Sequence, residues 1–535
     1  MNNEEKNLEQ VLWDSANVMR QTMGAADYMD YALGLIFYKH LSDKILEAAA
    51  NALVDAGEVE ESDVATEALR QAVYQAYYDN PDFHADLLST MDMDYAIQPK
   101  FTFTAFVADI DAGTFQLEDL NQAFRDLEQS NAKLLEHLFD DVDLHSTKLG
   151  STPQKRNDLI ADVMMALAPL NLDSHSGDVL GNAYEYLISN FASDMGQKAG
   201  EFYTPQSVST LLTRVVTNGQ EEKKNFTAYD PAMGSGSLLL NVRKYMKKAD
   251  SVEYYGQEIK TSTYNLARMN MILHGISATK QHLRNADTLD KDWPADEVTD
   301  FDGVMMNPPY SLKWSADKKF LQDSRFSDYG VLAPKSKADY AFLLHGLYHL
   351  KATGTMGIVL PHGVLFRGAA EGKIRRKLLE KGMIYAVIGL PAGIFYSTGI
   401  PTIIMVLKKD RPGRDVLFID GSKEFVKGKP QNTLTPANID RLFQAYQDRK
   451  DEDKFCHVAS FEEIADNDFN LNIPRYVDTF EPEPDVDLAK LNAEMAATNE
   501  EIKRNERELL AMMQELTTTD TKKAKDLQDF LKLFA

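Results

Sequence analysis

The order of apolar and polar positions divides the chain into a helical part and a part in which strands and helices alternate. Up to about residue 165, apolar residues recur every three or four positions in long stretches without proline or glycine. That spacing is the period of an amphipathic helix. It continues to about Val216, with more glycine and aromatic residues between Gly177 and Ile188. We predict a helical domain over residues 1–165.

A different pattern begins at about residue 225. Short β-rich runs alternate there with helical segments, which is typical of an α/β fold with a doubly wound, mostly parallel sheet. After about residue 412 the pattern becomes looser and mixed. We assign this fold to residues 166–475 and predict strands at 226–229, 252–256, 301–306, 355–360, 384–390 and 402–408.

The last segment is helical again. A Glu-Pro-Glu-Pro linker at 481–484 precedes it, so we predict a separate helical tail at residues 485–535. Its apolar positions have coiled-coil spacing, which suits either a partner helix or packing against the chain's own domain. These positions are Leu488, Leu491, Met495, Ile502, Leu509, Met512 and Leu516, interrupted by polar Thr498 and Asn505.

Composition excludes several protein classes. Cys456 is the single cysteine, so an internal disulfide framework is excluded and a reducing compartment is indicated. The first residues are polar and acidic, unlike a signal peptide, and no apolar run approaches membrane-spanning length. We expect a cytoplasmic protein that does not contact a membrane.

The net charge of −25 is unusual for a chain that binds nucleic acid, because phosphates attract lysine and arginine. Its distribution is uneven, since residues 1–150 hold nine Lys and Arg against 29 Asp and Glu. The segment from 301 to 381 is basic. It holds two clusters that are candidates for a phosphate track. The first consists of Lys313, Lys318, Lys319, Arg325, Lys335 and Lys337. The second, which could instead be a solvated helix face, consists of Arg367, Lys373, Arg375, Arg376 and Lys377.

The most informative stretch is Asn307-Pro308-Pro309-Tyr310, directly after the predicted strand at 301–306. Ligands bind at the carboxyl ends of strands in open α/β sheets. The Asn307 side-chain carbonyl and the Pro308 backbone carbonyl can accept both hydrogens of a planar NH2 group, which leaves the nitrogen lone pair free to attack. Tyr310 offers a flat face for a flipped-out base. A plain turn is the alternative interpretation of the tetrapeptide alone.

A candidate cofactor loop follows the first predicted strand. In Asp230-Pro-Ala-Met-Gly-Ser-Gly-Ser237, Gly234 and Gly236 let the backbone approach a ligand closely. A dinucleotide fingerprint would have a third glycine where Leu239 stands, and no P-loop motif is present, which argues against NAD, FAD and P-loop ATP. Glu258, just past the second strand, can accept hydrogen bonds from ribose hydroxyls. Asp287 lies where the next strand should end, and it can accept a hydrogen bond from an adenine amino group.

These motifs, in this order, resemble those of class I S-adenosylmethionine-dependent DNA adenine-N6 methyltransferases. Residues 12–43 and 177–205 more closely resemble the methylation subunit of type I restriction-modification systems. The resemblance covers nearly the whole chain. It implies that S-adenosylmethionine is bound by Glu201, Phe202, Tyr203, Thr204, Pro205, Gln206, Asp230, Met233, Gly234, Ser235, Gly236, Ser237, Glu258 and Asp287.

The resemblance also implies the catalytic residues. Asn307 and Pro308, held by the rigid Pro309, would orient the target N6 amino group, and Tyr310 would stack on the flipped adenine. A second stacking ring is expected late in the sheet domain, at Phe395 or alternatively Tyr396. No metal site is assigned.

Partners follow from the same resemblance. The chain shows no basic, loop-rich module that recognises bases, and in this family a separate specificity subunit recognises the sequence. We expect double-stranded DNA as substrate, with a specificity subunit, a second copy of the methylation subunit and a restriction and translocase subunit as partners. Two alternatives stay open: a protein glutamine N5-methyltransferase, whose amide acceptor also suits the Asn307 loop, and a non-catalytic methyltransferase-like scaffold.

Overall fold

The computed structural model describes residues 3–83, 87, 95–170, 172, 177–195, 203–290, 299–395, 399–429, 431–479 and 487–532. The chain forms two compact units, Met1–Asp478 and Thr479–Ala535. Among the helices in these ranges, none is both long and apolar enough to cross a membrane.

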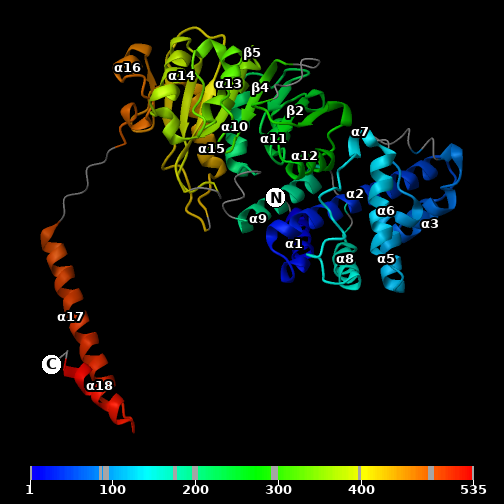
Figure 1. The fold of residues 1–535 in the computed structure, drawn as a ribbon, viewed down its shortest axis with the longest axis horizontal. Helices are drawn as coiled ribbons and strands as arrows, with labels where there is room; N and C mark the ends of the chain where they lie inside the picture. Colours follow the sequence, from blue (N-terminus) through cyan, green and yellow to red (C-terminus); the bar gives the residue numbers. More distant parts are fainter. Residues whose placement is uncertain are drawn as a thin grey trace. The chain divides into compact units, whose positions relative to one another are not determined.

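The N-terminal part of the first unit is helical, as predicted (Figure 1). Threonine side chains cap the starts of three of its helices, at Thr66, Thr102 and Thr152, by accepting backbone N–H groups. The α-helices described in this part are α1 (Asn3–Ala16), α2 (Ala25–Asp55), α3 (Glu67–Tyr77), α5 (Phe103–Ala112), α6 (Leu117–Ser130), α7 (Ala132–Leu135), α8 (Pro153–Leu167) and α9 (Gly177–Met195).

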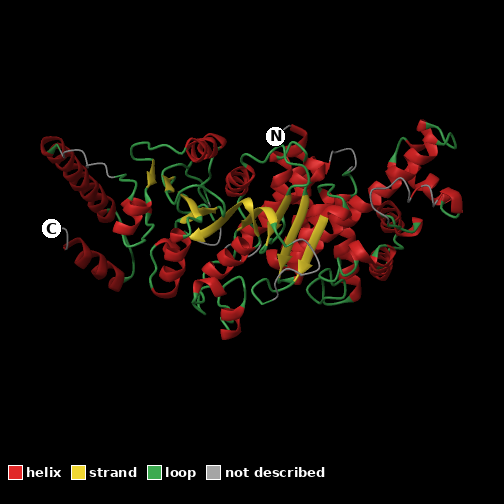
Figure 2. Ribbon diagram, turned by 90° about the horizontal axis from the view of Figure 1, so that it is seen from above, coloured by secondary structure: helices red, strands yellow, loops and turns green. Residues whose placement is uncertain are grey.

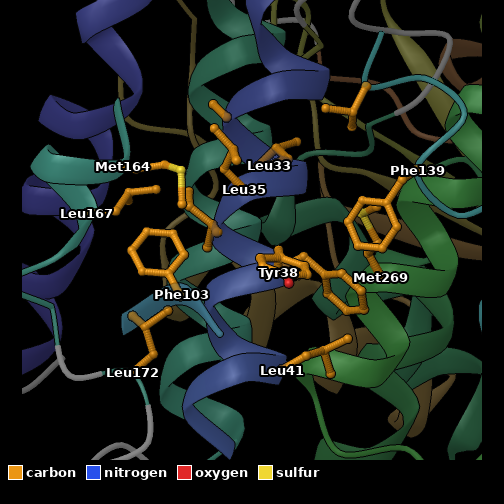
Figure 3. Packing of buried hydrophobic residues seen from close by; sticks show 14 of the residues in the cluster. Leu33, Leu35, Tyr38, Leu41, Phe103, Phe139, Met164, Leu167, Leu172 and Met269 are labelled. Carbon is orange, nitrogen blue, oxygen red and sulfur yellow. The ribbon is translucent and has the colours of Figure 1, made fainter. Parts of the chain in front are cut away.

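One apolar core joins this helical part to the sheet. Tyr38 of α2 lies at its centre, between Phe103 on one side and Phe139 and Met269 on the other (Figure 3). Met269 belongs to α12 (Thr261–Leu273), which follows the second strand of the sheet. Arg268 of the same helix donates to the carbonyls of Leu134 and Glu136. The helical part is therefore packed directly against α12 of the α/β part.

Within the described residues, nine strands form one twisted sheet with helices on both faces (Figure 2). Their order is β3-β2-β1-β4-β5-β7-β6-β8-β9, and all neighbours are parallel except where β7 or β9 takes part. The strands are β1 (Thr227–Asp230), β2 (Glu253–Glu258), β3 (Gln281–Asn285), β4 (Phe301–Met306), β5 (Leu350–Pro361), β6 (Ile384–Gly389), β7 (Thr402–Leu407), β8 (Val416–Asp420) and β9 (Cys456–Ala459).

Alternation along the strands supplies both faces of the sheet. In β7, Ile403 and Met405 belong to one buried cluster and Ile404 and Val406 to the other. Helices α13 (Asp339–Tyr348) and α14 (Ala369–Glu380) cover the first face, and α16 (Phe461–Asp466) also packs there. The second face is covered by α10 (Gln206–Thr217), α11 (Ser237–Tyr245), α12 and α15 (Pro436–Asp448).

The strand order places a binding crevice between β1 and β4. These strands are neighbours, but the chain leaves β1 toward β2 and leaves β4 toward β5, in the opposite direction. Ligands of open α/β sheets bind where the order reverses in this way, at the carboxyl ends of the strands. Asp230 and Asn307 stand at those two ends.

The second unit consists of α17 (Leu488–Gln514) and α18 (Thr521–Leu531). Asp487 caps α17 by accepting the backbone N–H groups of Ala489 and Lys490. The predicted apolar seam lies on α17 and continues to Leu516, and seven of its side chains are exposed: Leu488, Leu491, Met495, Ile502, Leu509, Met512 and Leu516.

Candidate active site

The Asn307 loop leaves β4, whose six residues are all buried. Its amide is held from both sides: Asn307 Nδ2 donates to Thr204 Oγ1 at 3.0 Å, and the Tyr310 hydroxyl donates to Asn307 Oδ1 at 2.8 Å. These bonds fix which end of the amide is the acceptor. An amide oxygen has two lone pairs, so Oδ1 retains the capacity to accept one hydrogen from a substrate amino group.

A buried ion pair fixes the exit of this loop. Ser311 has a φ of 53°, a left-handed conformation that L-residues seldom adopt. Its backbone N–H donates to Asp339 Oδ1 at 2.8 Å, and Arg367 donates to the other oxygen of Asp339 at 2.8 Å. Asp339 is buried at the start of α13. The unusual conformation after Tyr310 is thus stabilised by a charged hydrogen bond.

The two predicted stacking rings lie together. Tyr310 and Phe395 make an edge-to-face contact with ring centroids 6.0 Å apart and planes at 80°. Burial, and secondly the charge of Asp339, raises the pKa of Tyr310 well above its usual value, so the hydroxyl stays a donor. Because the rings touch edge to face, a base can enter between them only if one ring turns.

The glycine loop is tied to the second strand. Gly234 and Gly236 have φ values of 55° and 81°. The N–H of Gly234 donates to Glu258 Oε2 at 3.2 Å, and the N–H of Lys260 donates to Oε1 at 2.9 Å. Burial raises the pKa of Glu258, and these backbone donors oppose the shift. A side chain at Gly236 would approach Met271 of α12, so glycine also permits close helix packing there.

Asp230 has an unused buried acceptor. Its Oδ1 accepts the N–H of Ala232 at 2.9 Å, whereas Oδ2 is buried and finds no hydrogen-bond partner among the described residues. Burial, with the nearby Glu258 carboxylate, raises the pKa of Asp230 well above its usual value. A buried acceptor without a donor is costly, and a bound cation would relieve that cost.

A cavity of 680 Å³ opens between these loops, a volume typical of small-molecule sites. It is lined by Glu258, Asp287, Asn307 and Pro309 among the predicted residues. Pro231 and Ala232 of the predicted cofactor loop and Lys313 and Lys319 of the first basic cluster also line it, whereas the rest of the lining was not predicted. That part includes Ile259, Leu312, Trp314 and Phe342.

Ile259 is the most informative of these additions. It follows Glu258 directly, lines the cavity and has 65% of its surface exposed. A large exposed apolar side chain beside a carboxylate predicted to bind ribose suits the flat face of an adenine ring. An apolar residue directly after the acid at the end of a strand was the signal in the sequence.

The remaining predicted residues differ in their surroundings. The side chains of Met233, Ser235 and Ser237 are buried: Met233 packs in the core above Gly256, and the two serine hydroxyls are 3.0 Å apart. Tyr203 belongs to the core of the helical part, Pro205 precedes α10, and Gln206 donates to Asn241 at 3.0 Å. The predicted residues Glu201 and Phe202, and the rival ring Tyr396, lie outside the described residues.

The prediction that the second basic cluster lines a phosphate track is wrong for Arg367 and Arg375. Arg367 is paired with Asp339 and Glu371. Arg375 is buried and donates to the carbonyls of Val364, Arg367 and Phe469. Arg376, although exposed, is also paired, with Glu380. These arginines stabilise α14 and its neighbours.

Comparisons with known proteins agree with this geometry. The N-6 DNA methylase family matches residues 175–485, and the HsdM N-terminal domain matches residues 8–167. The type I restriction enzyme MpnII methylase subunit of Mycoplasma pneumoniae is 36% identical over 510 residues, covering 91% of this chain and 92% of that protein. The HindI methylase subunit of Haemophilus influenzae is 30% identical, covering 66% of this chain and 84% of that protein.

A solved structure is similar along most of the chain. The type I restriction-modification methyltransferase subunit of Streptococcus thermophilus has 58% sequence identity and a TM-score of 0.83, covering 89% of this chain and all of that one. The strand order, the Asn307 loop and the glycine loop fit the same assignment. The chain belongs to the N-6 DNA methylase family, as a relative of the methylase subunits of type I restriction enzymes.

Proposed function

We propose that the chain transfers the methyl group of S-adenosylmethionine to N6 of adenine in double-stranded DNA, as the methylation subunit of a type I restriction-modification complex. One observation carries the proposal: Asn307 and Glu258 line the same cavity, at the place where the strand order of the sheet reverses. The orientation of the Asn307 amide there is fixed by two hydrogen bonds. The family membership favours a DNA acceptor over the protein-glutamine alternative.

The residues at the cavity fit S-adenosylmethionine. The orphaned Asp230 Oδ2 suits the ammonium of the methionine part, although its side chain is not in the cavity wall. Glu258, fixed by two backbone N–H groups, suits the ribose hydroxyls. Ile259 and Asp287 line the cavity where they suit the face and the amino group of adenine. When bound, the cofactor supplies an electrophilic methyl group.

The chain's own residues then act on the target base. Asn307 Oδ1 and the Pro308 carbonyl accept the two hydrogens of the adenine N6 amino group and direct its lone pair toward the methyl group. Tyr310 and Phe395 hold the flipped ring by stacking, which contributes about 1–3 kcal/mol per base. No general base is needed, because the proton leaves after the nitrogen has become cationic and can pass to water.

Assembly completes this proposal. We assign residues 1–165 to a helical domain, 166–475 to the methyltransferase domain and 485–535 to a partner-binding tail. A separate specificity subunit recognises the DNA sequence, a second methylation subunit joins it, and a restriction and translocase subunit completes the complex, which acts in the cytoplasm. The exposed apolar seam of α17 supports a role in assembly.

The test is methyl transfer from labelled S-adenosylmethionine to genomic DNA from a host that lacks the system, with and without the co-expressed specificity subunit. We expect label in N6-methyladenine only with the partner, and its loss in Asn307→Ala. Asn121→Ala is the matched control, since Asn121 bonds to Glu118 and His145 on the surface of α6. A stable complex that binds cofactor but leaves DNA unlabelled would contradict the proposal.

A further inference from the structure

The segment after β3 forms one wall of the cavity and is stabilised by its own polar contacts. The N–H of Leu289 donates to Asp287 Oδ1 at 3.0 Å, so the position of this carboxylate depends on the backbone two residues later. The Thr288 hydroxyl donates to the Pro231 carbonyl at 2.6 Å. Residues 287–289 therefore connect the predicted adenine-binding carboxylate to the loop that follows β1.

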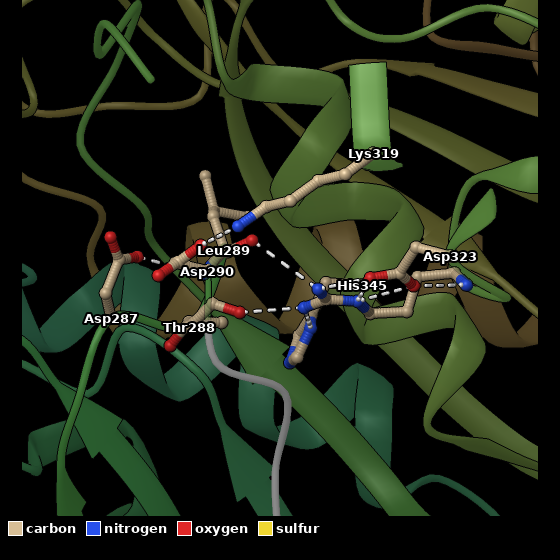
Figure 4. Close-up of polar contacts among 8 residues, drawn as sticks. Asp287, Thr288, Leu289, Asp290, Lys319, Asp323 and His345 are labelled. Atoms are coloured by element: carbon tan, nitrogen blue, oxygen red, sulfur yellow. Dashed lines mark hydrogen bonds and ion pairs between the residues drawn. The ribbon is translucent and has the colours of Figure 1, made fainter. Parts of the chain in front are cut away.

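A buried arginine holds this backbone from behind. Arg325 is 2% exposed, and its Nη1 donates to the Thr288 carbonyl at 2.8 Å and to His345 Nδ1 at 3.0 Å (Figure 4). Its Nη2 donates to Asp323 Oδ2 at 2.7 Å and, at 3.5 Å, to the Leu289 carbonyl. Nε donates to Asp323 Oδ1 at 3.0 Å. All five guanidinium N–H groups have an acceptor.

The histidine in this network has a defined tautomer. An arginine can only donate, so His345 Nδ1 is the acceptor and Nε2 carries the hydrogen. Nε2 then donates to the Tyr229 hydroxyl at 2.7 Å, and Tyr229 donates to Gln257 Oε1 at 2.5 Å. The Gln257 carbonyl accepts the N–H of Met233 at 3.0 Å. The network thus reaches from the 288–289 backbone to the glycine loop.

Arg325 comes from the segment between the Asn307 loop and α13, and the same segment lines the cavity. Leu312, Lys313, Trp314, Ser315, Asp317 and Lys319 face the cavity, and Lys319 donates to Asp290 at 2.9 Å. Residues 286–290 and residues 312–319 therefore form two parts of the cavity wall. Arg325 follows the second part in sequence and holds the first.

We propose that Arg325 is a positioning residue for cofactor binding, which sets the 288–289 backbone so that Asp287 meets the adenine of S-adenosylmethionine. This role rests on the proposed function. Arg325 touches neither the cavity nor the reacting atoms, and it acts through the backbone carbonyl of Thr288 and the Asp287 carboxylate beyond it. The residues that accept from Arg325 come from three places in the fold, which a lysine with a single donor centre cannot satisfy together.

The test measures S-adenosylmethionine affinity by calorimetry on the full chain, together with KM and kcat for methyl transfer in the complex. In Arg325→Lys we expect affinity about tenfold weaker and KM higher by the same factor, with kcat at saturating cofactor nearly unchanged. Arg449→Lys is the matched control: Arg449 also donates to two backbone carbonyls and a carboxylate, but at Tyr385 and Asp415, and should leave all three quantities unchanged.

A double-mutant cycle separates positioning from general stability. Asp287 is exposed, so Asp287→Ala should fold. If Arg325 acts through Asp287, then Arg325→Lys should weaken binding only about twofold in the Asp287→Ala background. A low thermal midpoint would show that Arg325→Lys is poorly folded. In that case Asp323→Asn is the second variant, because it weakens the ion pair of the same guanidinium at its partly exposed partner. It should also lower the affinity for S-adenosylmethionine.

The outcomes distinguish this role from the proposed function. A wild-type chain that fails to bind S-adenosylmethionine would overturn both. Two results would overturn the positioning role alone, provided that the wild type binds S-adenosylmethionine. One is an unchanged affinity in Arg325→Lys. The other is the same loss of affinity from Arg325→Lys in the wild type and in the Asp287→Ala background. A loss in kcat at saturating cofactor with KM unchanged would also overturn it, because it would place Arg325 in the chemical step.

Discussion

At the scale of single residues, the structure gives Thr204 a contact that the resemblance does not imply. Thr204 was predicted to bind the cofactor, and its hydroxyl oxygen also accepts a hydrogen bond from the Asn307 amide at 3.0 Å. This contact determines which way the amide points. We predict that Thr204→Val, which is close in shape, lowers kcat about fivefold because a net hydrogen bond of about 1 kcal/mol no longer orients Asn307.

The same variant should bind S-adenosylmethionine with wild-type affinity, as measured by calorimetry. Thr204→Ser keeps the hydroxyl and is the control that should retain most of the kcat. The opposite pattern, weaker cofactor binding with normal kcat, would show that Thr204 acts on the cofactor and not through Asn307.

Tyr310 combines a stacking face with a hydroxyl that bonds to Asn307, and two substitutions separate them. We predict that Tyr310→Phe lowers kcat by no more than about fivefold, the loss of one net hydrogen bond, because the face remains and Thr204 still holds the amide. Tyr310→Ala should lose about tenfold or more, since base stacking is worth about 1–3 kcal/mol. Fluorescence of 2-aminopurine at the target position, with kcat, is the measurement. Equal losses in both variants would show that the hydroxyl matters more than the ring.

At the scale of elements, hydrophobic pattern predicted the central strands and missed the edges. All six predicted strands are present, and 301–306 was predicted at its exact bounds, because buried parallel strands are continuous apolar runs. β5 begins five residues earlier than predicted. β8 and β9 were not predicted as strands, and β3 was expected only as a strand ending near Asp287, without bounds.

The edge strand β3 shows why. Its residues are Gln, His, Leu, Arg and Asn, none fully buried, so no apolar run marks it. It is stabilised instead by contacts with β2: His282 stacks on Tyr255 at 4.4 Å and pairs with Glu253, which Lys280 also contacts. Such contacts depend on which strand lies alongside, and local sequence does not contain that information.

Helix α13 carries a buried neutral histidine, which gives stability a pH dependence. Burial, with the charges of His349 and Arg325, lowers the pKa of His345 well below its ordinary value of about 6.5. Below pH 6.5 the unfolded chain takes up a proton that the folded chain does not. Stability from this residue is therefore complete above pH 6.5 and is lost as the pH falls, by up to about 1.4 kcal/mol per pH unit.

We predict that His345→Gln, which can still accept from Arg325 and donate to Tyr229, reduces this loss. The measurement is the free energy of unfolding in urea for both proteins at pH 7.5 and pH 5.5. All other titrating groups are the same in the two proteins, so the difference between the two pH dependences reports on His345. The wild type should lose more stability than the variant between the two pH values. Parallel shifts in the two proteins would contradict a neutral His345 in the folded state.

At the scale of the whole molecule, motifs predicted the site better than its support. Glu258, Asp287 and Asn307 come together in one cavity, and Tyr310 and Phe395 touch, because motif order follows the strand ends of a known sheet. The supporting residues were not predicted. Asp339 and Arg325 carry no local motif, and Arg325 was assigned to a phosphate track although it is buried. Their roles depend on tertiary contacts across 20 to 37 residues.

The C-terminal helices form a compact unit of their own. The α17 seam exposes apolar residues, and burying each Leu or Ile against a partner helix would contribute about 1.5–3 kcal/mol. We predict that Leu491→Asp with Ile502→Asp weakens association with the specificity subunit at least about a hundredfold, while the first unit still binds S-adenosylmethionine normally. Gel filtration of the co-expressed subunits and calorimetry on the chain measure the two properties.

The matched control places the same charge on the other side of the helix. Ala493→Asp with Ala497→Asp changes two exposed positions of α17 outside the seam, at a cost in helix propensity at least as large as that of the seam pair. It should leave assembly intact. If both pairs abolish association, helix stability rather than the seam is responsible, and if neither does, the specificity subunit binds elsewhere on the chain. Loss with the seam pair alone would make α17 the element through which a methyltransferase with an acidic N-terminal part acquires its DNA target.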